Sequence, residues 1–152
     1  MARPASIILF ERFYLGCWLV GLAVVAIAWN DQVAALAANP QVAALGMGAI
    51  QGMLIGGIAL SSLVTLLLWY FAARRQAVVA KWIIVVLYGF GLIGLPAIFL
   101  QLARGDLNGL LNIVVYALHT AAIVMLFRRD ARHWFGETRP DPIVSTPDKP
   151  YP

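Results

Sequence analysis

Four long stretches without a charged residue constrain this chain more than any other feature of its sequence. They cover residues 13–29, 32–73, 82–103 and 107–127. Because a helix rises about 1.5 Å per residue, about 20 apolar residues cross a hydrocarbon core of about 30 Å. Each stretch can supply one crossing. The sequence therefore predicts an all-α, polytopic membrane protein built as a bundle of four transmembrane helices.

The composition excludes several other classes of protein. Apolar residues make up 62% of the chain and charged residues only 12%, about half of the roughly 25% typical of soluble domains. This excludes a soluble enzyme of ordinary composition and a disordered chain. The formal charge of +4 does not indicate nucleic-acid binding, because no basic face is long enough to follow a phosphate backbone. The single cysteine excludes an internal disulfide and a multi-cysteine metal site.

We expect one transmembrane domain, residues 1–136, with helices at about 7–29, 42–73, 80–103 and 107–135. Before the second helix, residues 31–38 predict a short interfacial helix. Pro96 predicts a kink in the third helix, because proline cannot donate a helical hydrogen bond. After a helix stop at Gly136, five prolines among the last thirteen residues predict a proline-rich, disordered cytoplasmic tail over residues 137–152.

The distribution of Lys and Arg predicts the orientation in the membrane. If both chain ends lie inside, ten of the eleven basic residues fall in cytoplasmic segments and only Arg104 lies outside. This bias predicts an N-in, C-in arrangement. The first stretch has an alternative interpretation, since Arg3, Arg12 and the small residues Ala26 and Ala28 resemble a secretory signal peptide with its cleavage site. We favour an uncleaved helix, because the uncharged run of 17 residues is long for a signal peptide and three more spans follow.

Small residues at helical spacing predict tight helix packing in the second span. Gly48, Gly52 and Gly56 recur every four residues, and Gly57 begins a neighbouring ridge that continues into residues 61 and 65. Such residues let two helices approach closely in lipid. The pattern predicts a packing face but leaves open whether the partner helix belongs to the same chain.

Polar residues form a stripe on the fourth span. Asn108, Asn112, Tyr116 and His119 are spaced by 4, 4 and 3 residues, which confines them to an arc of about 80° at about 100° per residue. Polar groups in hydrocarbon need partners, so this stripe should face the inside of the bundle. We expect a polar layer within the membrane that comprises His119, Tyr116, Asn112, Asn108, Ser61, Thr65 and Gln51.

His119 is the most informative member of this layer. An ionisable group deep in a membrane is a candidate functional residue. One histidine cannot build a zinc site, which needs three or four ligands, and His133 lies outside the span, so a bis-histidine haem is not expected either. We therefore predict no metal and no cofactor, and we expect a neutral His119 bonded to a hydroxyl group on a neighbouring helix.

Glu11 lies where the first helix enters the bilayer. Arg74, Arg75, Arg128 and Arg129 belong to the same side by topology, which makes them candidate ion-pair partners. We favour a structural pair over a proton-coupled carboxylate, because Glu11 lies at the edge of the span.

The segments that bracket the four spans carry a resemblance. Residues 10–15 read Phe-Glu-Arg-Phe-Tyr-Leu, and residues 128–135 read Arg-Arg-Asp-Ala-Arg-His-Trp-Phe. Together they resemble small uncharacterised bacterial four-helix inner-membrane proteins. The resemblance implies a bacterial inner (plasma) membrane and carries no activity or catalytic residue to this chain.

These observations predict a non-catalytic integral membrane protein that packs with itself or with a membrane-protein partner through Gly48, Gly52, Gly56 and Gly57. One alternative is a small-solute or ion transporter that uses the polar layer around His119. Another is a membrane redox or lipid enzyme that uses His119 as a ligand or base. We expect the chain to contact the lipid bilayer and to associate as a homo-oligomer or with a membrane-protein partner, and not to bind nucleic acid.

Overall fold

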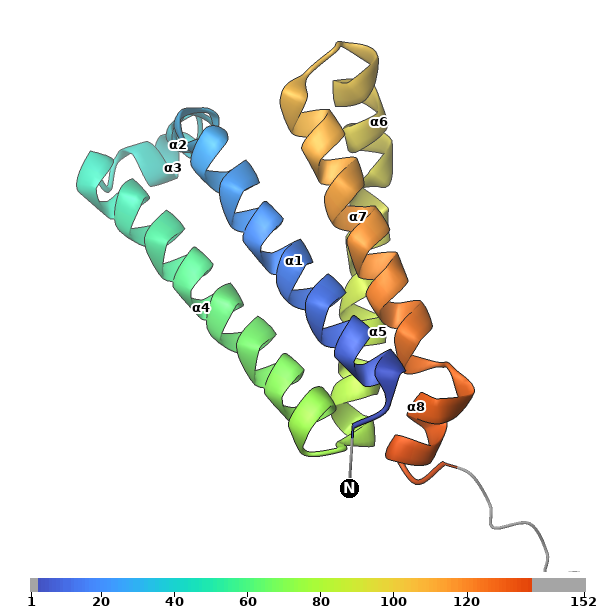
Figure 1. The fold of residues 1–152 in the computed structure, drawn as a ribbon. Helices are drawn as coiled ribbons and strands as arrows, with labels where there is room; N and C mark the ends of the chain where they lie inside the picture. Colours follow the sequence, from blue (N-terminus) through green and yellow to red (C-terminus); the bar gives the residue numbers. More distant parts are fainter. Residues whose placement is uncertain (1–2, 138–152) are drawn as a thin grey trace, which may run out of the picture.

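The structure, a computed structural model, describes residues 3–137, so the predicted tail lies outside the described residues except for Glu137. Within them the chain folds entirely into helices (Figure 1). In chain order these are α1 (Ala5–Ile27), α2 (Trp29–Ala37), α3 (Pro40–Ala43), α4 (Met47–Arg74), α5 (Val78–Gly91), a 3-10 turn η1 (Leu92–Gly94), α6 (Leu95–Ala103), α7 (Leu107–Leu126) and α8 (Arg129–Trp134).

Four helical segments are long and apolar enough to cross a membrane. They are α1, α4, the continuous stretch Val78–Ala103 that contains α5 and α6, and α7. The most extensive helix pair is α1 with α7; α4 packs against α1 and α5, and α6 packs against α7. Figure 1 shows α4 leaning away from α7, so that the bundle is wider at the end that carries α2 and α3. We call this the α2 end and the opposite one the α8 end.

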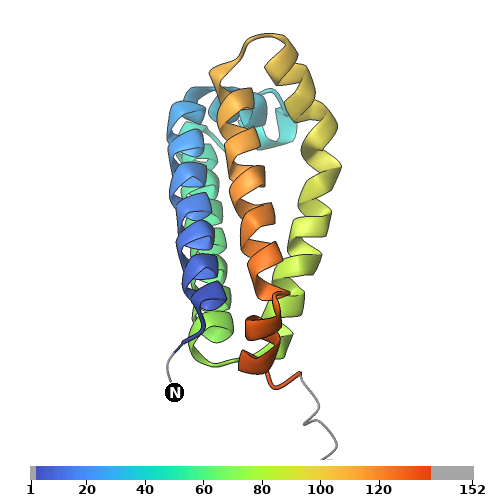
Figure 2. The same cartoon turned by 45° about the vertical axis from the view of Figure 1, so that its right-hand side comes forward.

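The buried apolar core lies at the α8 end. Ile7, Phe10 and Leu126 are fully buried there. Figure 2 shows α8 beneath the lower end of α7, where it closes this end of the bundle. The complete cluster of buried residues comprises Ile7, Phe10, Tyr14, Leu68, Ala72, Ala73, Ala80, Ile84, Ala122, Leu126, Ala131 and Phe135.

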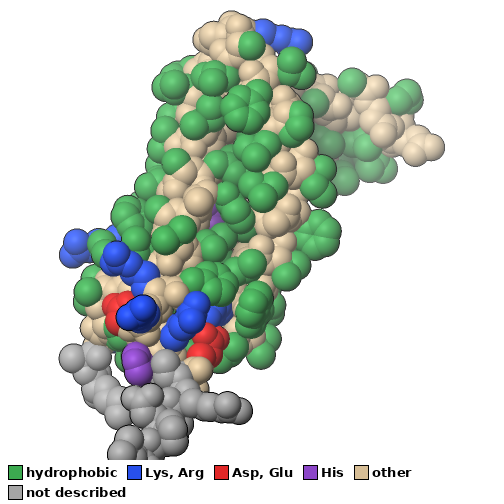
Figure 3. All heavy atoms as spheres, turned by 90° about the vertical axis from the view of Figure 1, so that its right-hand side faces the viewer, with side chains coloured by type: hydrophobic (Ala, Val, Ile, Leu, Met, Phe, Trp, Pro, Cys, Tyr) green, Lys and Arg blue, Asp and Glu red, His purple; other side chains and the backbone are tan. Residues whose placement is uncertain are grey.

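Outside this core, the long helices present apolar side chains outward. Only 6% of the most apolar window of α4 is buried, and the same share holds for the α5–α6 stretch. Ile93 is 78% exposed and Leu60 is 64% exposed. Exposing such surface to water costs about 25 cal/mol per Å², whereas hydrocarbon removes that cost. Figure 3 shows the same division, with hydrophobic side chains over the length of the bundle and charged groups gathered mainly at its lower end.

Two helix ends differ from the sequence prediction. The second long helix was expected to start at residue 42, but α4 begins at Met47 because Gly46 has a φ of +84°, which interrupts the helix after the short α3. The fourth helix was expected to continue to residue 135. Instead α7 ends at Leu126, and the backbone of Arg128 is extended before α8 begins.

The break before α8 has a physical reason. It turns α8 back toward the core, where Ala131 is fully buried and Phe135 is 7% exposed. The Asp130 carboxylate also accepts a hydrogen bond from the backbone N–H of Ser6 at 3.2 Å, which fixes α8 to the start of α1. Hydrogen bonding to Ser6 lowers the pKa of Asp130, which keeps the carboxylate charged.

Other local predictions are confirmed. A short helix, α2, is present where one was expected, and before Pro96 the α-helix is interrupted by the 3-10 turn Leu92–Gly94. The helix stop expected at Gly136 is also present, since this glycine follows α8 with a φ of +68°.

The turn between α6 and α7 brings two backbones together. Asp106 caps α7 by accepting a hydrogen bond from Asn108 N–H at 2.9 Å. One turn into α7, Gly109 is buried against the end of α6, and a Cβ at this position would lie 2.6 Å from the backbone nitrogen of Leu102. Only glycine fits this contact, so α7 is placed against α6 by the absence of a side chain.

We predict that Gly109→Ala destabilises the protein by about 1–3 kcal/mol, because the methyl group must push the two backbones apart. Gly89→Ala on α5 is the matched control, since a Cβ there meets nothing within 4 Å; it should leave stability unchanged or raise it by up to about 1 kcal/mol. Thermal unfolding in detergent measures both. Equal stability of the two variants contradicts the prediction.

Candidate functional site

A cavity of about 290 Å³ opens between α1, α4 and α7. Its volume is close to the lower end of the range of about 300–1,000 Å³ that small-molecule sites occupy. The cavity lies beyond the core, toward the α2 end. Its lining combines aromatic, hydroxyl and aliphatic side chains, namely Tyr14, Cys17, Trp18, Gly21, Leu22, Val25, Ile58, Ser61, Ser62, Thr65 and His119.

His119 reaches this cavity from α7. Its ring packs edge-on against Tyr14, with 5.6 Å between centroids, and lies 5.1 Å from the ring of Tyr88. The hydroxyl partner expected for His119 is absent, because its buried Nε2 has no hydrogen-bond partner. Tyr14 on α1 and Tyr88 on α5 contact the imidazole through their rings, and the Tyr88 hydroxyl is hydrogen-bonded to Thr120 instead.

Most other polar groups in the cavity are engaged. The Trp18 indole donates to Ser62 Oγ at 3.2 Å, which links α1 to α4. Ser61 Oγ donates to the carbonyl of Ile58 at 3.1 Å, and the thiol of Cys17 donates to the carbonyl of Val115 at 3.4 Å. The cavity wall is therefore held by hydrogen bonds that tie all three helices together.

The structure brings together only part of the predicted polar layer. Ser61, Thr65 and His119 line the same cavity. Tyr116 points elsewhere, since its hydroxyl donates to the carbonyl of Gly91 on the α5 side. Close by, Thr120 Oγ1 donates to the Tyr116 carbonyl at 2.8 Å and shares a hydrogen bond with Tyr88.

Asn108 and Asn112 belong to a second cavity of about 450 Å³ at the α2 end. Asn112 Nδ2 donates to the Asn108 carbonyl at 2.9 Å. Gln51 is exposed and lines neither of these two cavities. The second cavity is lined by Val24, Val25, Ala28, Asp31, Gln32, Ala35, Gln101, Asp106, Asn108 and Asn112.

Three of the predicted glycines, Gly48, Gly52 and Gly56, lie on the side of α4 away from the other helices, whereas Gly57, seven residues from the buried Ile50, shares the face of Ile50. A Cβ placed at Gly48, Gly52, Gly56 or Gly57 meets nothing within 4 Å. Gly48 and Gly52 each lie two residues from Ile50, which is 1% exposed. At about 100° per residue, a separation of two residues places both glycines about 160° around the helix from Ile50. In a single copy of the chain this ridge therefore packs against no other helix.

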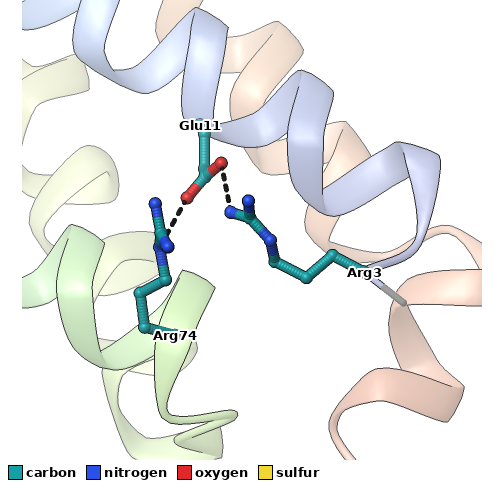
Figure 4. Close-up of polar contacts among 3 residues, drawn as sticks. All are labelled: Arg3, Glu11 and Arg74. Atoms are coloured by element: carbon teal, nitrogen blue, oxygen red, sulfur yellow. Dashed lines mark hydrogen bonds and ion pairs between the residues drawn. The ribbon is translucent and has the colours of Figure 1, made fainter. Parts of the chain in front are cut away.

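Glu11 forms ion pairs at the α8 end (Figure 4). Its carboxylate lies 3.2 Å from Nε of Arg74, one of the expected partners, and 2.8 Å from a guanidinium nitrogen of Arg3, which the sequence analysis did not propose. Arg75 lies over the ring of Tyr70 instead, 5.8 Å from its centroid. Arg128 and Arg129 are exposed and make no ion pair with Glu11.

Sequence reasoning missed a buried cation at the same end. Lys81 is only 1% exposed, and its ammonium contacts both carboxylate oxygens of Glu137 at 2.8 and 2.9 Å. The rings of Phe127 and Phe135 lie 4.4 and 5.2 Å from the same nitrogen, in reach of a cation–π contact. These contacts fasten α5 to α8. No local pattern could have revealed them, because the partners lie 56 residues apart.

Among residues 3–137, no group of three or more His, Cys, Asp or Glu side chains is arranged to hold a metal ion. No known family model, curated protein or solved structure matches the chain. The cavity and the outward-facing glycines of α4 are the features of the described residues that bear on function.

We predict that Glu137→Gln costs more stability than Lys81→Met. The first change leaves a buried ammonium without its counter-charge and should cost about 1–3 kcal/mol, because Glu137 remains 28% exposed and solvent screens the pair. The second removes the buried charge and keeps an apolar side chain of similar length, so its cost should be smaller. Chemical unfolding in detergent compares the two, and the reverse order contradicts the prediction.

Proposed function

We propose that this chain is a multi-pass protein of a bacterial inner membrane, with both ends in the cytoplasm, that works by associating with a second copy of itself through α4. The observation that carries the proposal is the position of Gly48, Gly52 and Gly56, which lie on the side of α4 away from the remaining helices. The role we assign is that of a packing subunit without catalysis of its own.

The environment of this ridge supports association in lipid. Two apolar helices gain no hydrophobic free energy by meeting in hydrocarbon, so close backbone contact must supply the attraction. Small residues at four-residue spacing permit that contact. A Cβ placed at Gly56 meets nothing within 4 Å, so no side chain of the same copy keeps another helix from approaching this face.

A second copy is the simplest partner for such a face. When two identical chains meet about a two-fold axis, the same surface is used on both sides. The ridge on α4 is self-complementary in this sense, since glycine on one helix faces glycine on the other. The closed α8 end holds each copy together independently, through its core and ion pairs, so that association does not require refolding.

We predict that Gly52→Ile weakens self-association at least tenfold, because the branched side chain separates the two backbones. Gly89→Ile is the matched control, since it makes the same change at an exposed glycine on α5. Energy transfer between donor- and acceptor-labelled copies in liposomes measures association as the protein is diluted into lipid. The proposal is wrong if wild-type protein gives no transfer above random mixing, or if both variants associate like wild type.

A second candidate function is small-solute or ion transport. It is favoured by one observation, that His119, Ser61 and Thr65 line the same cavity between the helices. The core residues Phe10 and Leu126 are fully buried at the α8 end. Passage through one copy therefore requires this core to open, which makes transport the less supported of the two functions.

If the protein conducts protons, His119→Leu should reduce the flux at least fivefold, because the only imidazole in the cavity is lost. His133→Leu is the control, because this histidine lies on α8 outside the four long helices. Reconstituted vesicles with an internal pH dye measure the flux. Equal flux in wild type and His119→Leu removes the transport candidate.

A further inference from the structure

The cavity between α1, α4 and α7 is polar toward the α8 end, which we call its floor, and apolar toward the α2 end. Tyr14 and Cys17 lie nearer the α8 end of α1, whereas Gly21, Leu22 and Val25 follow toward the α2 end. The antiparallel α4 repeats the order, with hydroxyl groups at residues 61, 62 and 65 and an aliphatic side chain at residue 58. The cavity therefore fits an amphipathic molecule whose polar head points toward the α8 end.

The charge of the lining selects an uncharged head. None of the residues that line the cavity is Lys, Arg, Asp or Glu. A phosphate or an ammonium group in this position would lose its hydration without gaining an opposite charge. Phospholipid head groups and ionic solutes are therefore poor ligands for this cavity.

The hydrogen bonds at the floor favour a head group that accepts hydrogen bonds. Ser62 Oγ already accepts a hydrogen bond from the indole N–H of Trp18, so its own O–H is left to donate to another acceptor. His119 lines the cavity and its Nε2 has no partner, but this nitrogen is buried, so the imidazole must turn toward the cavity before Nε2 can donate to a ligand. Carbonyl oxygens on a ligand would satisfy both groups.

The aromatic side chains of the lining favour a ligand whose head group is a flat ring. Tyr14, Trp18 and His119 contribute three aromatic rings to the lining, and such rings pack well against other planar π-systems. Gly21 leaves space beside them, because a Cβ there meets nothing within 4 Å. A volume of about 290 Å³ accommodates the head of a lipid-soluble molecule but not its whole tail, which would extend from the apolar end of the cavity.

We propose that this cavity binds the head group of a quinone-type lipid, that is, an uncharged ring with carbonyl oxygens carried on an apolar tail. Ser62 and His119 hold the carbonyl oxygens, and the aromatic rings contact the faces of the ligand. The proposal concerns binding only. It does not rest on association through α4, because Gly48, Gly52 and Gly56 do not line the cavity.

The test uses full-length protein in nanodiscs of uncharged lipid, with decyl-substituted 1,4-benzoquinone as the probe. A ligand that binds only the folded state raises the midpoint of thermal unfolding in a saturable way. We expect such a rise for wild type. Gly21→Leu, which fills the cavity, should increase the probe concentration needed for half of the effect at least tenfold, and His119→Leu at least fivefold.

Gly16→Leu is the matched control, because it makes the same change on α1 at an open glycine that does not line the cavity; it should respond like wild type. If Gly21→Leu does not fold, Ser62→Ala takes its place, since it removes the hydroxyl group without adding bulk to the cavity. A rise that does not saturate, or that is equal in all variants, overturns the proposal. The assignment to quinones is also overturned if decanol or phosphatidylglycerol gives the same saturable rise with the same dependence on Gly21.

Discussion

The structure depends first on hydrogen bonds between backbone groups within each helix. The outward faces of α4 and of the α5–α6 stretch present aliphatic and aromatic side chains over most of their length, with only 6% of either apolar window buried. In a hydrocarbon solvent such faces offer the backbone no other partner, so every amide must be satisfied inside its own helix. The helical fold and its apolar exterior follow from this one requirement.

Packing between the helices is uneven along the bundle. At the α8 end, the apolar core, the Glu11 ion pairs and the buried Lys81 join α1, α4, α5 and α8. Toward the α2 end the helices are less closely packed, and both polar cavities lie there or beside it. The α8 end thus holds the fold together, while the cavity and the glycine face used in the two proposals lie outside this core.

The spans could be predicted from the sequence because they depend on a local property. An uninterrupted apolar run is enough by itself to predict a membrane span. The four runs correspond to the four long helical segments of the structure. Helix breaks at proline and glycine also depend on the residue itself, so the turn before Pro96 and the helix stop at Gly136 could be predicted as well. Gly46 was missed as a helix break because nothing in the neighbouring residues indicates its positive φ.

The candidate site was less predictable because its contacts join distant parts of the chain. The stripe on α7 was visible in the spacing of its residues, but it divides between two cavities, since Asn112 and His119 lie at different levels of the bundle. Trp18 on α1 was not expected in the cavity, where it donates to Ser62. The ion pair between Lys81 and Glu137 likewise joins residues that are far apart in the sequence. Such pairings become visible only when the helices are placed in space.

The central claim, four crossings with both chain ends on the cytoplasmic side, is tested most directly by labelling cysteines in sealed vesicles of known orientation. In a Cys17→Ala background, single cysteines are introduced at Ala5, Ala34 and Arg132, which are all exposed. A membrane-impermeant maleimide should label positions 5 and 132 from the cytoplasmic side only, and position 34 from the opposite side only. Labelling of positions 5 and 132 from opposite sides would contradict the four-span account.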